Sequence, residues 1–68
     1  MDIYGLKLNS KIGKMPKYSN IDDCMTDVFI EHPNADFSEW HNTSTASWMD
    51  IIEENRVIGA IMKLPERW

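Results

Sequence analysis

The stretch from Trp48 to Leu64 constrains the fold most, because its hydrophobic period changes near Asn55. Before Asn55, Trp48 and the Ile51–Ile52 pair fall on one side of a helix, with carboxylates on the other side. After Asn55, residues 57–64 form an apolar run that fits an extended strand. The pattern predicts a helix over 48–54, closed by a left-handed Asn55, that leads into a buried strand over 57–64.

A strand is also predicted at the start of the chain, over residues 3–8, where Tyr4, Leu6 and Leu8 would share one face. Asn9–Ser10 favours a turn, so residues 11–15 could return as a short second strand whose lysines suit an exposed edge. Pro16 would end that strand. We expect this N-terminal strand or hairpin to pair with the C-terminal strand.

The strongest helical signal covers residues 21–31. Its apolar residues stand at i, i+3, i+4, i+7 and i+8, namely Ile21, Cys24, Met25, Val28 and Phe29. Ser19 or Asn20 can cap the helix, and the first turn holds acidic residues where the helix dipole favours them. Pro33 should end it at His32. The residues leave one alternative open, in which 28–32 and 37–42 are strands joined by a turn.

The middle of the chain predicts a further short helical turn. Asp36 and Glu39 have the spacing of a capping box, and the turn would carry Phe37 and Trp40. The expected fold is therefore a single α+β domain over residues 1–68, with a small antiparallel sheet packed by two or three short helices. The expected core residues are Ile3, Leu6, Leu8, Ile21, Met25, Val28, Phe29, Trp48, Ile51, Ile52, Ile58, Met62 and Leu64.

Composition indicates a small, soluble cytoplasmic protein. The 68 residues allow one core, and 43% of them are hydrophobic. Cys24 is the only cysteine, so an intramolecular disulfide is excluded and a reducing compartment is expected. The first residues do not resemble a signal peptide, and no apolar run is long enough to cross a membrane.

Charge is unevenly distributed along the chain. Residues 1–20 hold four lysines and one aspartate, whereas residues 21–68 hold ten carboxylates and three basic side chains. The net charge of −4 disfavours general nucleic-acid binding, which depends on neutralising phosphates. The acidic faces either keep the protein soluble or meet a basic surface on a protein partner.

Catalytic and metal-binding patterns are weak. Cys24, His32, His41, Asp36 and Glu39 are residue types that bind zinc, but their spacing matches no zinc signature. Cys24 belongs to the apolar helix side, where a buried thiol is unreactive. The three glycines lie far apart, so no phosphate-binding loop is present. We expect neither enzymatic activity nor a cofactor or metal.

The expected function is binding: an acidic helical surface would modulate or inhibit a larger protein partner. Small acidic inhibitors encoded by viruses and plasmids, some of which mimic nucleic acid, share this size and charge. The candidate partner-binding residues are Asp22, Asp23, Asp27, Asp50, Glu53, Glu54, Trp40 and Trp68.

Three alternatives stay open. A winged-helix-like DNA-binding regulator would use residues 48–54 as its recognition helix, although that helix is acidic. A metal-binding or catalytic mini-domain is the second alternative. Self-association is the third, because short strands leave edges that a second copy could extend.

Overall fold

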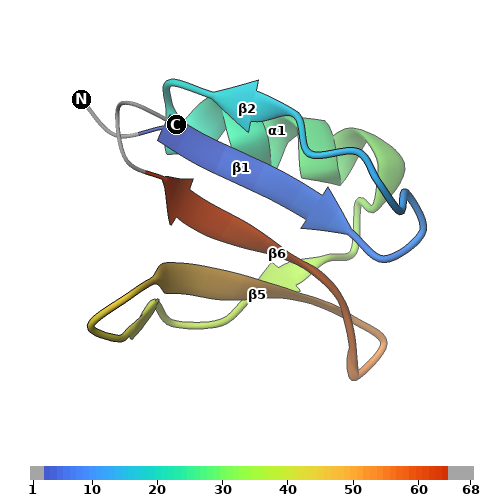
Figure 1. Ribbon diagram of the computed structural model, residues 1–68. Coiled ribbons are helices and arrows are strands. Elements are labelled where there is room, and N and C mark those ends of the chain that lie inside the picture. Colours follow the sequence, from blue (N-terminus) through green and yellow to red (C-terminus); the bar gives the residue numbers. More distant parts are fainter. Residues whose placement is uncertain (1–2, 65–68) are drawn as a thin grey trace.

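Residues 3–64 form a six-stranded antiparallel sheet with one helix on one of its faces (Figure 1). The computed structural model describes residues 3–64. The strands are β1 (Ile3–Leu8), β2 (Lys17–Tyr18), β3 (Asp36–Phe37), β4 (His41–Asn42), β5 (Ser47–Glu53) and β6 (Arg56–Leu64), and the helix is α1 (Ile21–Glu31). Their order across the sheet is β2-β1-β6-β5-β3, and β4 also pairs with β5. This arrangement confirms the α+β class.

The centre of the sheet joins the two ends of the described chain. β6 pairs with β1 in antiparallel register from Ile3 opposite Leu64 to Leu8 opposite Gly59. The expected pairing of the C-terminal strand with the first strand is therefore confirmed. Because β5 pairs along the other side of β6, the long strand β6 is hydrogen-bonded on both sides.

The predicted helix over 48–54 is wrong, since these residues form strand β5. Successive side chains of β5 alternate between the two faces of the sheet, so that Met49 and Ile51 are buried and Trp48 is half-buried on the other face. Glu54 and Asn55 both have positive φ, 52° and 63°, as in a two-residue hairpin turn. Asn55 is left-handed as expected, but it links two strands instead of ending a helix.

Two other local predictions are also wrong. Residues 11–15 form a loop instead of a returning strand, and β2 starts only after Pro16, whose carbonyl accepts a hydrogen bond from the Leu6 amide. The capping-box segment 36–39 does not form a helical turn. Its first two residues form strand β3, whose backbone pairs with β5. Within residues 3–64 there is thus one helix, not two or three.

The prediction of α1 is confirmed at both ends. The Asn20 side-chain oxygen accepts a hydrogen bond from the Asp22 amide at 2.7 Å, which makes Asn20 the N-cap. His32 caps the other end directly before Pro33. The alternative with a strand over 28–32 is therefore wrong.

The core lies between α1 and the sheet. The buried residues are Leu6, Leu8, Cys24, Val28, Ala35, Met49, Ile51, Ile61 and Leu64. All of them belong to this core except Leu64, which is buried on the other face of the sheet beside Gly5. The core prediction is wrong for Phe29, which is exposed, and the other expected residues outside this set are only partly buried. The expected core did not include Met49 and Ile61. Both faces of β5 and β6 carry apolar residues, so the sequence pattern does not show which face is buried.

We expect Gly59→Ala to destabilise the protein strongly. A Cβ at position 59 would lie 2.3 Å from the backbone carbonyl oxygen of Lys7, which the β1–β6 ladder holds in place. The free energy of unfolding should fall by about 1–3 kcal/mol, as in overpacked cores, and urea denaturation would measure it.

Gly5→Ala is the matched control, because its new Cβ would chiefly meet flexible side chains, with the Met15 sulfur 2.9 Å away. Equal losses of stability in the two variants would contradict the close approach at Gly59.

Candidate functional site

The predicted acidic residues do not form one continuous surface. In the predicted helix, Asp50, Glu53 and Glu54 would lie on one side. In the structure, side chains of strand β5 alternate between the two faces of the sheet, so these three residues are separated. The Asp50 carboxylate lies on the sheet face away from α1, with Oδ2 3.4 Å from His41 Nε2. Glu53 lies toward α1, where its Oε1 is 3.2 Å from His32 Nδ1. Glu54 is exposed in the turn.

The helix keeps the other predicted acids together. Asp23, Thr26, Asp27 and Ile30 stand at i, i+3, i+4 and i+7, so they form one stripe along α1. All four are exposed, and we call this stripe the outer face of α1. Ile30 is 73% exposed, which is unusual for a large aliphatic side chain on a helix whose other side is buried. Asp22 adjoins the stripe in the first turn.

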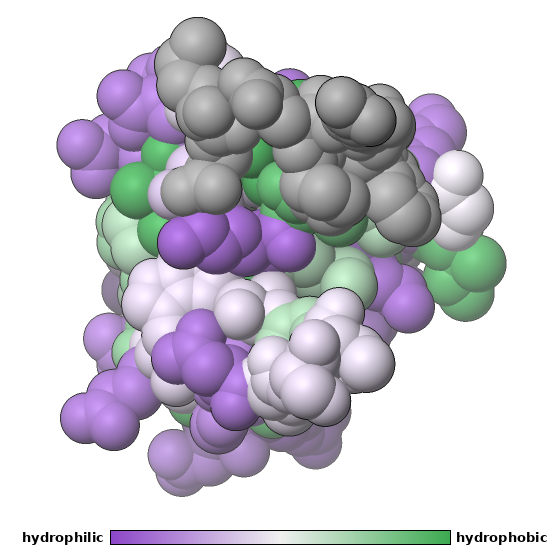
Figure 2. All heavy atoms as spheres, turned by 60° about the vertical axis from the view of Figure 1, so that its left-hand side comes forward, coloured by the Kyte–Doolittle hydropathy of each residue, from purple (hydrophilic) through white to green (hydrophobic). Residues whose placement is uncertain are grey.

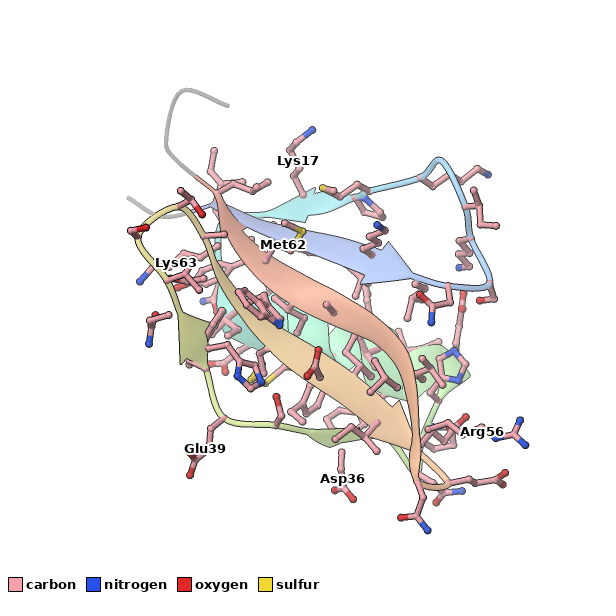
Figure 3. The ribbon with its side chains drawn as sticks, turned by 60° about the horizontal axis from the view of Figure 1, so that its bottom comes forward. Lys17, Asp36, Glu39, Arg56, Met62 and Lys63 are labelled. Carbon is pink, nitrogen blue, oxygen red and sulfur yellow. The ribbon has the colours of Figure 1, made fainter. Side chains whose placement is uncertain are left out.

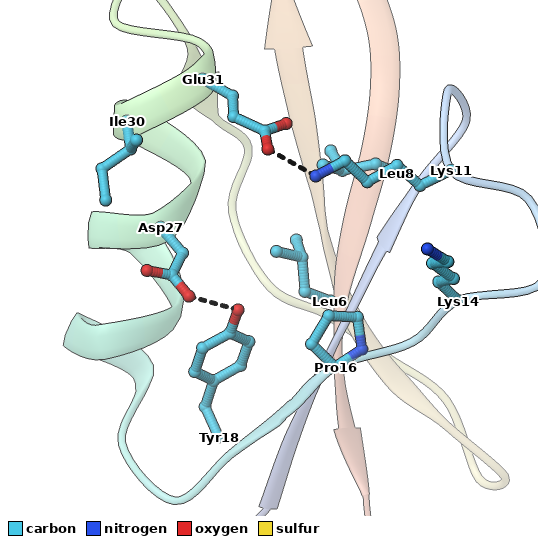
Figure 4. Close-up of a pocket in the computed structure, with 9 residues that line it drawn as sticks. All are labelled: Leu6, Leu8, Lys11, Lys14, Pro16, Tyr18, Asp27, Ile30 and Glu31. Atoms are coloured by element: carbon cyan, nitrogen blue, oxygen red, sulfur yellow. Dashed lines mark hydrogen bonds and ion pairs between the residues drawn. The ribbon is translucent and has the colours of Figure 1, made fainter.

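Two polar contacts hold α1 against the basic N-terminal segment (Figure 4). The Tyr18 hydroxyl donates a hydrogen bond to Asp27 Oδ2 at 2.5 Å, and the Lys11 ammonium contacts Glu31. Partial burial, followed by the hydrogen bond and charge of Asp27, raises the pKa of Tyr18 to about 12. These contacts connect the helix to β2 and to the loop over residues 9–16.

A pocket of about 280 Å³ lies beside the outer face of α1. Figure 4 shows Leu6 and Leu8 between the helix, on the left, and the lysine-bearing loop. The lining residues are Leu6, Leu8, Lys11, Lys14, Pro16, Tyr18, Asp27, Ile30 and Glu31. The leucines, the proline and Ile30 give the pocket apolar walls, while both polar contacts stand at its border. Two lysines, Lys11 and Lys14, balance the two carboxylates of the lining, Asp27 and Glu31.

The two tryptophans within residues 3–64 occupy different sides of the sheet. Trp40 packs against the core, with its ring centroid 6.2 Å from that of Tyr4. Trp48 lies on the opposite face and stacks with His41 at 5.2 Å between centroids. The predicted interface role of Trp40 stays a prediction, and Trp68 lies outside the described residues.

Cys24 is fully buried in the core. Burial, and secondarily the charge of Asp27, raises the pKa of its thiol from 9.0 to about 11. The thiol is thus un-ionised near neutral pH, which disfavours its use as a nucleophile or metal ligand. Across residues 3–64, no group of three or more His, Cys, Asp or Glu side chains is arranged to hold a metal ion.

The helix-turn-helix alternative lacks its central element, because the proposed recognition helix is strand β5. The side of the molecule in Figure 2 is mostly hydrophilic or near-neutral over its described part. No helix in residues 3–64 has the length and apolar character required to cross a membrane.

Comparisons with models of protein families, with curated proteins and with solved structures gave no match to this chain.

We expect stability to fall at alkaline pH through Cys24 and Tyr18. Both groups have a higher pKa in the folded protein, about 11 against 9.0 and about 12 against 10.0. The unfolded chain therefore loses these protons first, so stability is complete below pH 9 and declines as pH rises toward 12. For Cys24 the loss is at most about 3 kcal/mol.

Urea denaturation at pH 8, 10 and 11 would measure this decline, with Cys24→Ala as the comparison. The variant should lose stability less steeply with pH, whatever its stability at pH 8. Parallel pH profiles for the two proteins would contradict a buried, un-ionised thiol.

Proposed function

We propose that this protein is a non-catalytic binding protein that modulates or inhibits a larger protein partner through the outer face of α1. The observation that carries the proposal is the exposure of Ile30 on a helix stripe shared with Asp23 and Asp27. Burying a side chain of this kind on a partner would contribute about 1.5–3 kcal/mol. The carboxylates beside it favour a partner with a basic surface.

The partner is proposed to insert a lysine or arginine into the pocket beside α1. The aliphatic stem of such a side chain would contact Leu6, Leu8 and Ile30, and its charge would approach Asp27 and Glu31. These carboxylates already contact Tyr18 and Lys11, so the pocket is partly preorganised before binding. Electrostatic attraction would speed association, and the apolar contact would slow dissociation.

The proposal places the protein in the cytoplasm, in keeping with its single buried thiol. Mimicry of nucleic acid on a basic partner surface is one form that inhibition could take. A DNA-binding role is the weaker proposal, because the acidic outer face of α1 would repel phosphates.

Loss of the outer face should strongly reduce partner recovery. We expect the double variant Asp23→Lys, Ile30→Ala to recover at least tenfold less partner than the wild type in an affinity pull-down from extract of the source cells. The wild-type yield should also fall as salt increases, because the charges involved are exposed. Quantitative mass spectrometry of the bound fraction would measure both effects.

The matched control is Glu39→Lys, Ile12→Ala, which makes the same chemical changes at exposed positions outside α1. Ile12 is 92% exposed in the loop over residues 9–16. Equal recovery with both double variants would contradict a role for the outer face of α1.

A further inference from the structure

The sheet face away from α1 carries rows of neighbouring side chains that run across the strands, and two of these rows hold charged residues. The register places Lys17, Gly5, Met62, Trp48 and His41 in the first row. Lys7, Ala60 and Asp50 form the second row. We call this surface the open face, because no helix covers it among the residues that the structure describes.

The middle of the open face is apolar and partly exposed. Trp48, Ala60 and Met62 are each half-buried there. The side chain of Met15 folds over Gly5, with its sulfur 2.9 Å from where a Cβ on Gly5 would lie. Ala60 is the small central residue of the second row, whereas Met62 and Trp48 stand in the first, so a second sheet would pack on these side chains at the spacing of about 10 Å found in stacked sheets.

The charges on the open face have opposite signs at its two sides. Both rows begin with a lysine on β1 or β2, and the acidic residues stand on β5 and β3. Figure 3 views this face: Lys17 extends from the upper edge of the sheet, and Met62 lies between it and the lower edge. Asp36 and Glu39 extend from that lower edge. The surface is thus polarised across the strands, from basic to acidic.

We propose that a second copy of this chain packs on the open face, about a two-fold axis parallel to β6. Such an axis exchanges the two sides of the sheet but keeps each row in place along the strands. Lys7 of each copy would then lie over Asp50 of the other. In the first row, Lys17 would lie over the stacked Trp48 and His41 of the other copy, where a cation–π contact is available.

A second copy fits this face better than a partner of one charge sign. A polyanion would be repelled by Asp50 and Asp36, and a basic surface by Lys7 and Lys17. Because the same polarised surface occurs on both copies, one rotation satisfies both signs at once. Both edges of the sheet are occupied by short strands, β2 on one side and β3 with β4 on the other. The face, rather than an edge, is therefore the proposed contact.

The test uses the full-length chain and two single variants, Lys7→Glu and Asp50→Lys. Sedimentation velocity over a range of protein concentrations should show a monomer–dimer equilibrium for the wild type. Each variant alone should associate at least about tenfold more weakly, because both symmetric contacts become repulsive. An equimolar mixture should restore association, since the exchanged charges attract at both contacts of the heterodimer.

The mixture also serves as the folding control, because only folded chains can form the heterodimer. Glu39→Lys and Lys14→Glu are matched controls outside the two rows and should leave association unchanged. A monomeric wild type at millimolar concentration would overturn the proposal. It would also be overturned if the mixture stayed monomeric.

This inference goes beyond the proposed binding function and can fail separately from it. The outer face of α1 lies on the other side of the sheet, so a dimer would present two such faces. Dimerisation is measured on the purified protein alone, whereas partner recovery depends on Asp23 and Ile30.

Discussion

The pairing of β6 with β1 is the interaction on which the remaining structure depends. It joins the two ends of the described chain, and the contact of Gly59 with the Lys7 carbonyl fixes its spacing. Once β6 is central, β1 and β2 with their lysines lie at one side of the sheet, and β5 and β3 with Asp50 and Asp36 lie at the other. The open face is polarised because of that placement.

The helix α1 was predictable because three local signals agree: an apolar period, a capping asparagine and a proline after its end. Strand β5 was not, because Trp48, Ile51 and Ile52 also match helical spacing when both faces of a strand are apolar. Among the acidic residues predicted to bind a partner, only Asp22, Asp23 and Asp27 were correctly assigned to a helix. The pocket beside them depends on the loop over residues 9–16, for which the sequence shows no comparable pattern.

Several carboxylates connect separate elements of the fold. Asp27 accepts a hydrogen bond from Tyr18 on β2, Glu31 contacts Lys11 in the loop between β1 and β2, and Glu53 contacts His32 beyond α1. Exposed contacts of this kind contribute little stability individually. Their effect is to orient α1 on the sheet, which leaves Asp23 and Ile30 on its outer face. The acidic composition therefore serves both structure and the proposed binding surface.

A chain of 68 residues buries a small core, so coverage of any apolar surface has a large effect on its stability. The open face holds Trp48 and Met62 only half-buried. A second copy placed there would raise stability with the logarithm of protein concentration, because only the folded chain can dimerise. It would also double the number of α1 surfaces, so that a partner with two basic sites would bind more tightly than one with a single site. The two faces of one small sheet would in this way support assembly on one side and recognition on the other.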